Sequence, residues 1–142
     1  MQVFIVGSPL ETAMALSRRH LNNQINEASI ILAALNGAKA WSNHPCVLQY
    51  RGCEAWLRAY YGCLYSYVRG KEQDAIVYSE LADAIRPDWH DQRYYDNMKA
   101  RLYTKNPHHY AQFAEYGTSE ENWYWSQEQG EWRKYVNSKR IE

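Results

Sequence analysis

Apolar residues recur every three or four positions along most of the chain, which is the spacing of one face of an α-helix. The clearest run begins at His20 and stops before Gly37. Its apolar positions are Leu21, Ile25, Ala28, Leu32 and Leu35. A second long run covers residues 50–67 and stops before Gly70. A glycine just beyond the last apolar position is a common helix stop, so both runs are predicted to be amphipathic helices.

Capping residues and prolines predict several shorter helices. Ser8 and Glu11 can form a capping box around Pro9, so a helix is predicted from there to about residue 17. Another is predicted over residues 74–85, before Pro87. Asp88 can cap a helix that continues to residue 105, and residues 107–117 are predicted to form a last short helix.

The fold class follows from the same patterns. No set of strands with alternating polarity, no repeat and no Pro/Gly/Ser-rich linker is evident. We therefore predict an all-α fold, a single domain over residues 1–142 with a helical core (1–117) and an aromatic C-terminal extension (118–142). The N-terminal MQVFIV is predicted to pack as an extended segment across the helices. For the irregular, Trp-rich extension, helix and hairpin both stay open.

Composition excludes several classes of protein. A chain of 142 residues with 46% hydrophobic and 15% aromatic positions is typical of a folded domain rather than a disordered one. The longest apolar stretch, residues 30–35, is too short to cross a bilayer, and the N-terminus lacks the basic region of a secretory signal. We expect a cytoplasmic protein with no membrane association. Cys46, Cys53 and Cys63 are odd in number and have no CxxC spacing, so they are predicted to be buried thiols.

Charge and aromatic content give conflicting indications about nucleic acid. Sixteen Lys and Arg residues balance sixteen Asp and Glu residues, and this neutrality argues against a DNA-binding protein. Thirteen Tyr and six Trp residues against two Phe suit binding clefts, although such residues also fill small cores. Residues 90–110 combine four Lys and Arg residues with interleaved tyrosines, a composition that contacts phosphates and stacks bases. A solvated helix face explains this segment equally well.

Candidate catalytic groups lie on the first long helix. His20, Gln24 and Glu27 are spaced by four and three positions, so they share one face. This face borders the apolar one, where partial burial raises the pKa of a carboxyl such as that of Glu27 toward general acid/base use. Asn43 and His44, in the loop that follows, are polar groups that could serve the same site, although His44 could equally cap the next helix. No cofactor motif or metal-ligand spacing is present, so we expect neither a cofactor nor a metal.

Three motifs, in this order, carry a family resemblance: LSRRHLNNQINEASIIL, WSNHPCVLQYRGCEAW and MKARLYTKNPHHYAQF. Together they resemble the pyrimidine-dimer DNA glycosylase family of the phage endonuclease V type, from the N-terminus to about Tyr116. The resemblance implies an all-α glycosylase with an associated abasic-site lyase activity. It also implies that the N-terminal α-amine is the nucleophile and that a glutamate on an early helix assists it.

The resemblance also implies roles for individual residues. Glu27 matches the family glutamate, His20 matches a histidine near the abasic sugar, and the amine is that of Met1, because Gln2 disfavours removal of the initiator. The predicted substrate-binding residues are Gln24, Asn43, His44, Arg101, Lys105 and Tyr110. Of these, Arg101 and Lys105 match basic residues that face DNA in the family, and Tyr110 falls in its C-terminal aromatic motif.

The sequence departs from the family at two positions near the family glutamate, where the family has arginines that bind phosphate. Asn26 and Ile30 stand where arginines neighbour the family glutamate, so the choice of lesion is open. The leading hypothesis is a monomeric DNA glycosylase and abasic-site lyase for damaged or modified pyrimidines, including pyrimidine dimers, in double-stranded DNA. Two alternatives stay open: a glycosylase for another modified base in foreign or phage DNA, and a noncatalytic module that binds DNA or a protein.

Overall fold

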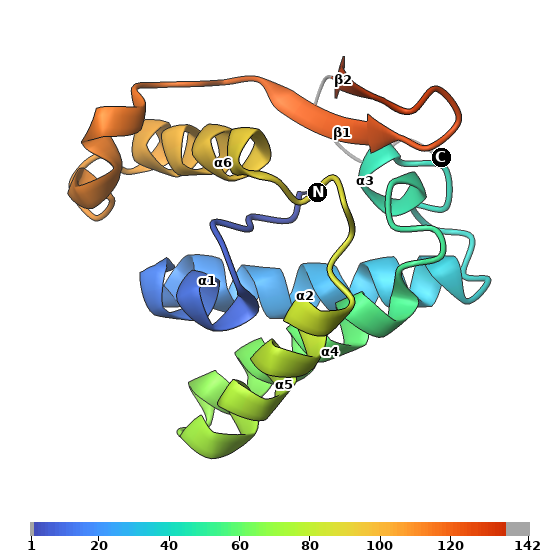
Figure 1. Cartoon of the computed structure of the whole chain (residues 1–142), viewed down its shortest axis with the longest axis horizontal. Coiled ribbons are helices and arrows are strands. Elements are labelled where there is room, and N and C mark those ends of the chain that lie inside the picture. Colours follow the sequence, from blue (N-terminus) through green and yellow to red (C-terminus); the bar gives the residue numbers. More distant parts are fainter. Residues whose placement is uncertain (1, 136–142) are drawn as a thin grey trace.

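The computed structural model describes residues 2–135, which are mostly helical, as predicted. The helices are α1 (Pro9–Ala15), α2 (Arg18–Leu35), α3 (Pro45–Leu48), α4 (Glu54–Val68), α5 (Glu72–Ala84), α6 (Gln92–Lys105) and the 3-10 helix η1 (Ala111–Tyr116). The strands β1 (Asn122–Ser126) and β2 (Glu131–Tyr135) follow. In Figure 1, α4 and α5 lie below α2, and α6 lies above it. No helix of the described part is long and apolar enough to cross a membrane.

The first two helices begin where side chains cap them. The Ser8 hydroxyl accepts from the Glu11 N–H at 3.1 Å, and the Glu11 carboxylate accepts from the Ser8 N–H at 3.2 Å, which is the predicted capping box. Helix α2 begins two residues before His20, because the Ser17 hydroxyl accepts from the His20 N–H. Gly37, just beyond α2, has a positive φ of 108°, consistent with the predicted stop.

The second long helix is shorter than predicted. Residues 50–53 form a turn with Gly52 at a φ of 82°, so α4 begins only at Glu54. The separate short helix α3 precedes this turn, and His44 caps it through Nδ1, which accepts from the Cys46 N–H at 3.0 Å. The capping alternative for His44 is therefore confirmed.

The start of α6 also differs from the prediction. Asp91, and not Asp88, caps this helix by accepting from the Tyr94 N–H at 3.0 Å. Trp89 and His90 are buried in the core, and the His90 N–H bonds to the Pro87 carbonyl in a turn. Burial of these two rings therefore takes the chain away from a helical path before Asp91.

The extension that follows Gly117 forms a hairpin, which resolves one of the alternatives left open. Strands β1 and β2 pair antiparallel, with Trp125 opposite Trp132. The side-chain oxygen of Gln49 accepts from the Trp125 N–H at 3.1 Å, and this bond ties the hairpin to the end of α3 (Figure 1). Residues 136–142 of the predicted extension lie outside the described residues.

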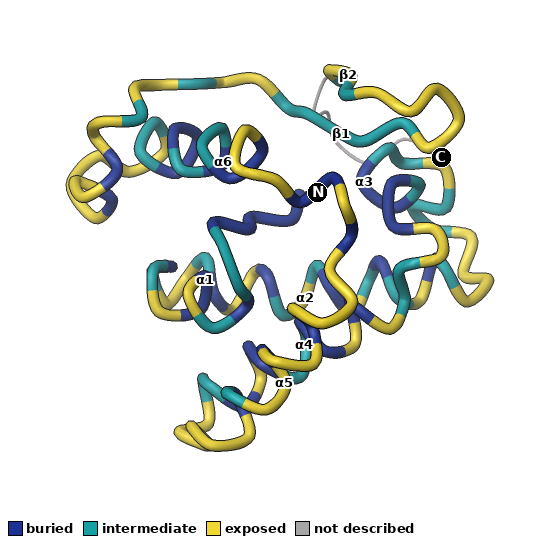
Figure 2. The backbone as a smooth tube through the Cα atoms, in the orientation of Figure 1, coloured by how far each residue is buried: buried dark blue, intermediate teal, exposed yellow. Residues whose placement is uncertain are grey.

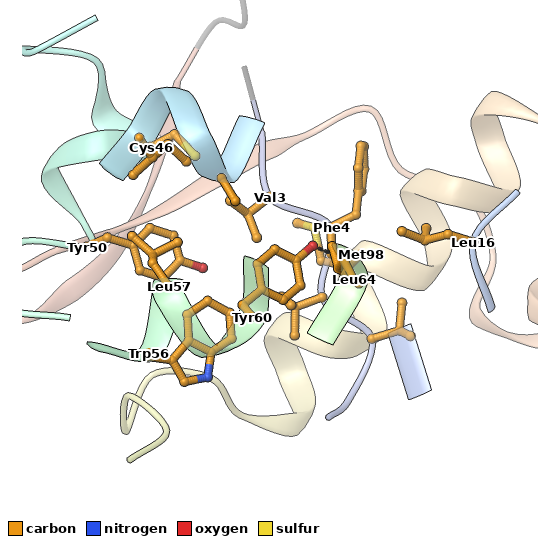
Figure 3. Packing of buried hydrophobic residues seen from close by; sticks show 14 of the residues in the cluster. Val3, Phe4, Leu16, Cys46, Tyr50, Trp56, Leu57, Tyr60, Leu64 and Met98 are labelled. Atoms are coloured by element: carbon orange, nitrogen blue, oxygen red, sulfur yellow. Dashed lines mark hydrogen bonds between the residues drawn. The ribbon is translucent and has the colours of Figure 1, made fainter. Parts of the chain in front are cut away.

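The N-terminal segment runs through the middle of the molecule, as predicted. Residues 2–6 are all buried, and Figure 2 shows them as a continuous dark stretch between α2 and α6. The Tyr94 hydroxyl donates to the Val3 carbonyl at 3.2 Å, and Figure 3 shows Val3 and Phe4 beside Tyr60 and Met98. The segment is thus held between the early and late parts of the chain.

The rest of the core is filled with aromatic rings. Tyr50, Trp56 and Tyr60 stack with centroid distances of 5.5 and 5.0 Å, and His90 meets the edge of Trp56 at 4.5 Å. These residues are buried, so here the core-filling alternative applies rather than a binding surface. Cys46 and Cys63 are buried free thiols as predicted, whereas Cys53 is only partly buried because it stands in the turn that precedes α4.

We expect the buried His90 to make the fold sensitive to acid. Burial lowers the pKa of His90 from 6.5 to about 3, so the unfolded chain takes up a proton below pH 6.5 and the folded chain does not. The free energy of unfolding should fall as the pH drops from 6.5 to 3, by about 1.4 kcal/mol per pH unit for this one proton. Urea titrations across this range give the free energy of unfolding at each pH. Its dependence on pH should be smaller by one proton in His90→Phe than in the wild type, and unchanged in the exposed control His108→Gln. Equal slopes in His90→Phe and the wild type would contradict the prediction.

Candidate active site

A pocket of about 410 Å³ opens beside the N-terminal segment. One wall is this segment, with Gln2 and Phe4, and a second wall is the polar face of α2, with His20, Gln24 and Glu27. Lys105, the last residue of α6, closes the third side. The structure therefore joins the predicted stripe of α2 to the N-terminus and to the basic segment of α6, which lies almost eighty positions later in the sequence.

Glu27 is the acidic group of this pocket. Its side chain is half-buried, and Oε2 is shielded from solvent without a hydrogen-bond partner among the described residues. Burial raises the pKa of Glu27 above its ordinary value. The predicted position at the core rim and the predicted direction of the pKa shift are both confirmed. A carboxyl that has this environment and no hydrogen-bond partner among residues 2–135 is suited to exchange protons with a bound molecule.

Gln24 fixes the N-terminal segment on α2. Its side-chain oxygen accepts from the Phe4 N–H at 2.9 Å and from the Tyr60 hydroxyl at 2.7 Å. Its amide nitrogen donates to the Gln2 carbonyl at 2.8 Å. Gln24 is almost fully buried, so the structure gives it a positioning role, and the direct substrate contact expected from the sequence stays a prediction. Met1, the predicted nucleophile, lies outside the described residues.

His20 lies at the end of the pocket that faces Tyr110. The Tyr110 hydroxyl is 2.6 Å from His20 Nδ1, and the two rings stack at 5.6 Å. Burial lowers the pKa of His20 below its ordinary value, and the charge of Lys105 acts in the same direction. The imidazole is therefore neutral near pH 7. Tyr110 itself is fully buried, so it supports His20 from behind, and its predicted contact with DNA is not tested by this arrangement.

The two basic residues of α6 differ in exposure. Lys105 is exposed and its ammonium lies 5.8 Å from the centre of the Phe4 ring. Arg101, one turn earlier, is only 6% exposed, and its Nε and Nη1 atoms have no partner among residues 2–135. Partial burial lowers the pKa of Lys105, and the neighbouring charge of Arg101 adds to this effect. Unpaired buried donors of this kind are costly, so Arg101 is suited to receive an anion.

Not all the predicted residues line the pocket. Asn43 is exposed in the loop after α2, and His44 is occupied in capping α3 and meets the edges of Trp41 and Tyr135 at 5.5 and 5.4 Å. Neither of the two lines the pocket, and their contact with DNA stays a prediction. Within the described part of the chain, no group of three His, Cys, Asp or Glu side chains is arranged to hold a metal ion.

Five lining residues were missed by the sequence argument: Gln2, Phe4, Arg19, Asn23 and Asn26. Arg19, Asn23 and Asn26 are spaced by four and three positions, as His20, Gln24 and Glu27 are, so this neighbouring stripe could have been found from the pattern. Phe4 could not, because an apolar residue in an extended segment gives no sign that it borders a pocket.

Comparison with known proteins bears on this pocket directly. A family model described as pyrimidine dimer DNA glycosylase matches residues 1–71, which is half of the chain. The chain belongs to this family. The predicted family is thus confirmed, and the match covers the first two of the three motifs, whereas the third lies beyond it. Membership indicates a DNA glycosylase whose substrate is DNA. No curated protein and no solved structure gives a significant match.

The matched residues supply two of the three pocket walls. The N-terminal segment and all of α2 lie within residues 1–71, so His20, Gln24 and Glu27 belong to the part shared with the pyrimidine dimer DNA glycosylase family. Arg101, Lys105 and Tyr110 lie beyond it. The third wall therefore rests on this chain's own geometry.

Proposed function

We propose that this family member excises a damaged or modified pyrimidine, with pyrimidine dimers as the first candidates, from double-stranded DNA and then cleaves the abasic site. The proposed nucleophile is the α-amine of Met1, which forms a Schiff base with C1′ of the deoxyribose. One observation carries the proposal: Gln24 holds the main chain of Gln2 in the same pocket as the half-buried Glu27.

The N-terminal amine is favoured by the position of Gln2. Consecutive Cα atoms are about 3.8 Å apart, so an amine on the preceding residue is within one residue's reach of the pocket. An α-amine has an ordinary pKa of about 7.7 to 8.0, so an appreciable fraction is neutral and nucleophilic near pH 7. Among the described residues, Lys105 brings an amine to the pocket, and the experiment below distinguishes it from the proposed Met1 amine.

Glu27 is the residue proposed to take the proton on which strand cleavage depends. The amine attacks C1′, the bond from C1′ to the base breaks, and the base leaves with the bonding electrons. The nitrogen then loses one proton, the C1′–O4′ bond breaks with its electrons on O4′, and O4′ takes up a proton, so the sugar ring opens and the Schiff base forms. Glu27 then takes the C2′ proton, and the 3′ phosphate leaves in a β-elimination that cuts the strand. The free Oε2 atom of Glu27 supports this role.

Local charge supports DNA binding in a chain of zero net charge. Arg19 and Lys105 border the pocket, and Arg101 supplies buried donors without partners one turn from Lys105. Anionic phosphates beside the target nucleotide would pair with these groups. A positive rim around the pocket is compatible with neutrality, since the opposing acids can lie elsewhere on the molecule.

Borohydride trapping tests the proposal. The full chain is incubated with a duplex that contains one abasic site, reduced with borohydride, digested and analysed by mass spectrometry. We expect an adduct on the Met1 peptide. An adduct on Lys105 would contradict the assigned nucleophile. No adduct, while a known lyase traps normally, would overturn the lyase chemistry and favour a noncatalytic DNA-binding module.

A second assay addresses the base. Duplexes that contain a pyrimidine dimer, another damaged pyrimidine or an undamaged site are incubated with the enzyme, and release of the base is followed. Cleavage of the dimer-containing duplex is expected. Exclusive cleavage at another modified base would instead support the alternative glycosylase.

A further inference from the structure

The hydroxyl of Tyr110 makes two hydrogen bonds that the steps above do not use. It accepts from the Ser17 main-chain N–H at 3.0 Å, and it lies 2.6 Å from Nδ1 of His20. The ring is fully buried and stacks on the imidazole at an interplanar angle of 14°. A residue from the turn after α6 thus reaches the first turn of α2, which borders the pocket.

The proton count at this hydroxyl determines the state of His20. A tyrosine hydroxyl carries one proton, and a main-chain N–H can only donate, so the bond from Ser17 uses an oxygen lone pair. If His20 Nδ1 also donated, the hydroxyl would accept twice, and its own proton would be buried without a partner. The favoured arrangement has the hydroxyl donating to Nδ1, which leaves the proton of the neutral ring on Nε2.

The second ring nitrogen is the one available to a ligand. His20 lines the pocket, and its Nε2 is not among the buried atoms without a partner, nor does it bond to any described residue. The groups that face the ring are the cations Arg19 and Lys105 and the imidazole of His109, together with the Phe4 ring at 6.0 Å. These cations and burial disfavour a charged imidazole, so the tautomer decides what His20 presents.

We propose that Tyr110 is a positioning residue that fixes His20 as the Nε2–H tautomer and so presents a neutral hydrogen-bond donor to an oxygen of the deoxyribose-phosphate in the pocket. The identity of the acceptor rests on the proposed function, whereas the tautomer rests on the hydrogen bonds alone. The burial of Tyr110 supports this role, because no water molecule can replace His20 as the hydrogen-bond partner of a hydroxyl that is shielded from solvent.

The tautomer can be read without any DNA. In protein labelled with nitrogen-15, long-range proton–nitrogen correlations give the protonation state of each imidazole nitrogen. We expect the wild type to carry the His20 proton on Nε2, and Tyr110→Phe to show a mixture of the two tautomers. A proton on Nδ1 in the wild type, or an unchanged tautomer in Tyr110→Phe, would overturn the proposal.

Tyr50→Phe is the matched control. The Tyr50 hydroxyl is also fully buried and also bonds to a histidine, His90, at 3.0 Å, but neither residue lines the pocket. This variant should keep the His20 tautomer of the wild type. A change of the His20 signal in Tyr50→Phe as large as that in Tyr110→Phe would show a general effect on the fold, which contradicts a specific role.

Rates of strand cleavage test the link to catalysis. Under single-turnover conditions with an abasic duplex, Tyr110→Phe should lower the rate about tenfold, the effect of one hydrogen bond. In a His20→Phe background, the same change should have no further effect, because Tyr110 acts through His20. Additive losses would overturn the positioning role. If neither the wild type nor any variant cleaves DNA, and the tautomer still shifts in Tyr110→Phe, the proposed function fails and the positioning role of Tyr110 stands.

Discussion

Glu27→Gln should cut DNA at abasic sites about 10²- to 10⁴-fold more slowly than the wild type, because an amide cannot take the C2′ proton. The substitution keeps the size of the side chain and adds no charge, so the fold should be retained. Strand cleavage under single-turnover conditions measures the rate, and the unfolding midpoint in urea monitors the fold. The half-buried carboxyl and its free Oε2 atom are the reason that we expect the largest effect here.

Glu72→Gln is the matched control for this variant. Glu72 is an exposed glutamate in the first turn of α5, and it does not line the pocket. The Glu72→Gln variant should cleave abasic DNA at the rate of the wild type. Cleavage by Glu27→Gln at that same rate would show that the proton acceptor is another group.

Gln24→Leu should destabilise the protein and inactivate it together. Leucine has nearly the same size but leaves the Phe4 N–H and the Gln2 carbonyl buried without the partners they now have. The Tyr60 hydroxyl loses its 2.7 Å bond to Gln24 and keeps only the 3.5 Å bond to the Phe4 carbonyl. Each buried group without a partner costs about 1 to 3 kcal/mol, so the loss should reach several kcal/mol. The shift of the urea midpoint measures this loss, and faster hydrogen exchange of the Phe4 amide would locate it.

Asn22→Ala is the control for Gln24→Leu. Asn22 is exposed on the same helix, and its replacement should change the free energy of unfolding by no more than about 0.5 kcal/mol. If Gln24→Leu unfolds at the midpoint of the wild type, or if its Phe4 amide exchanges at the wild-type rate, Gln24 does not hold the N-terminal segment.

The parts of the fold that the sequence predicted are those with local causes. The capping box at Ser8, the 3.6-residue period of α2 and the stop at Gly37 involve neighbours in the chain, so they could be read directly. The predictions were wrong where contacts between residues far apart in the sequence determine the position of a helix end. The cap of α6 lies at Asp91 because Trp89 and His90 are buried in the core, where Trp89 packs on Tyr50 and His90 packs on Trp56 of α4. The local sequence pattern does not contain these contacts.

The candidate site was predictable to the same extent. The face shared by His20, Gln24 and Glu27 followed from helical spacing, and Lys105 followed from the family resemblance. What the sequence could not show is which polar groups face inward. Gln24, Arg101 and Tyr110 were all expected to contact substrate, and the structure buries each of them. Gln24 and Tyr110 have hydrogen-bond partners from other elements, which the local sequence pattern does not contain, whereas Arg101 keeps buried donors without a partner among the described residues.

The buried N-terminal segment also constrains when the site can form during synthesis. The Val3 carbonyl bonds to Tyr94, which follows it by 91 positions, and the Gln2 side chain contacts Met98. The first residues to be synthesised can therefore make these contacts only after α6 has been synthesised. Contacts with so large a sequence separation form late in folding. A nascent chain on the ribosome therefore has no completed pocket until α6 has emerged.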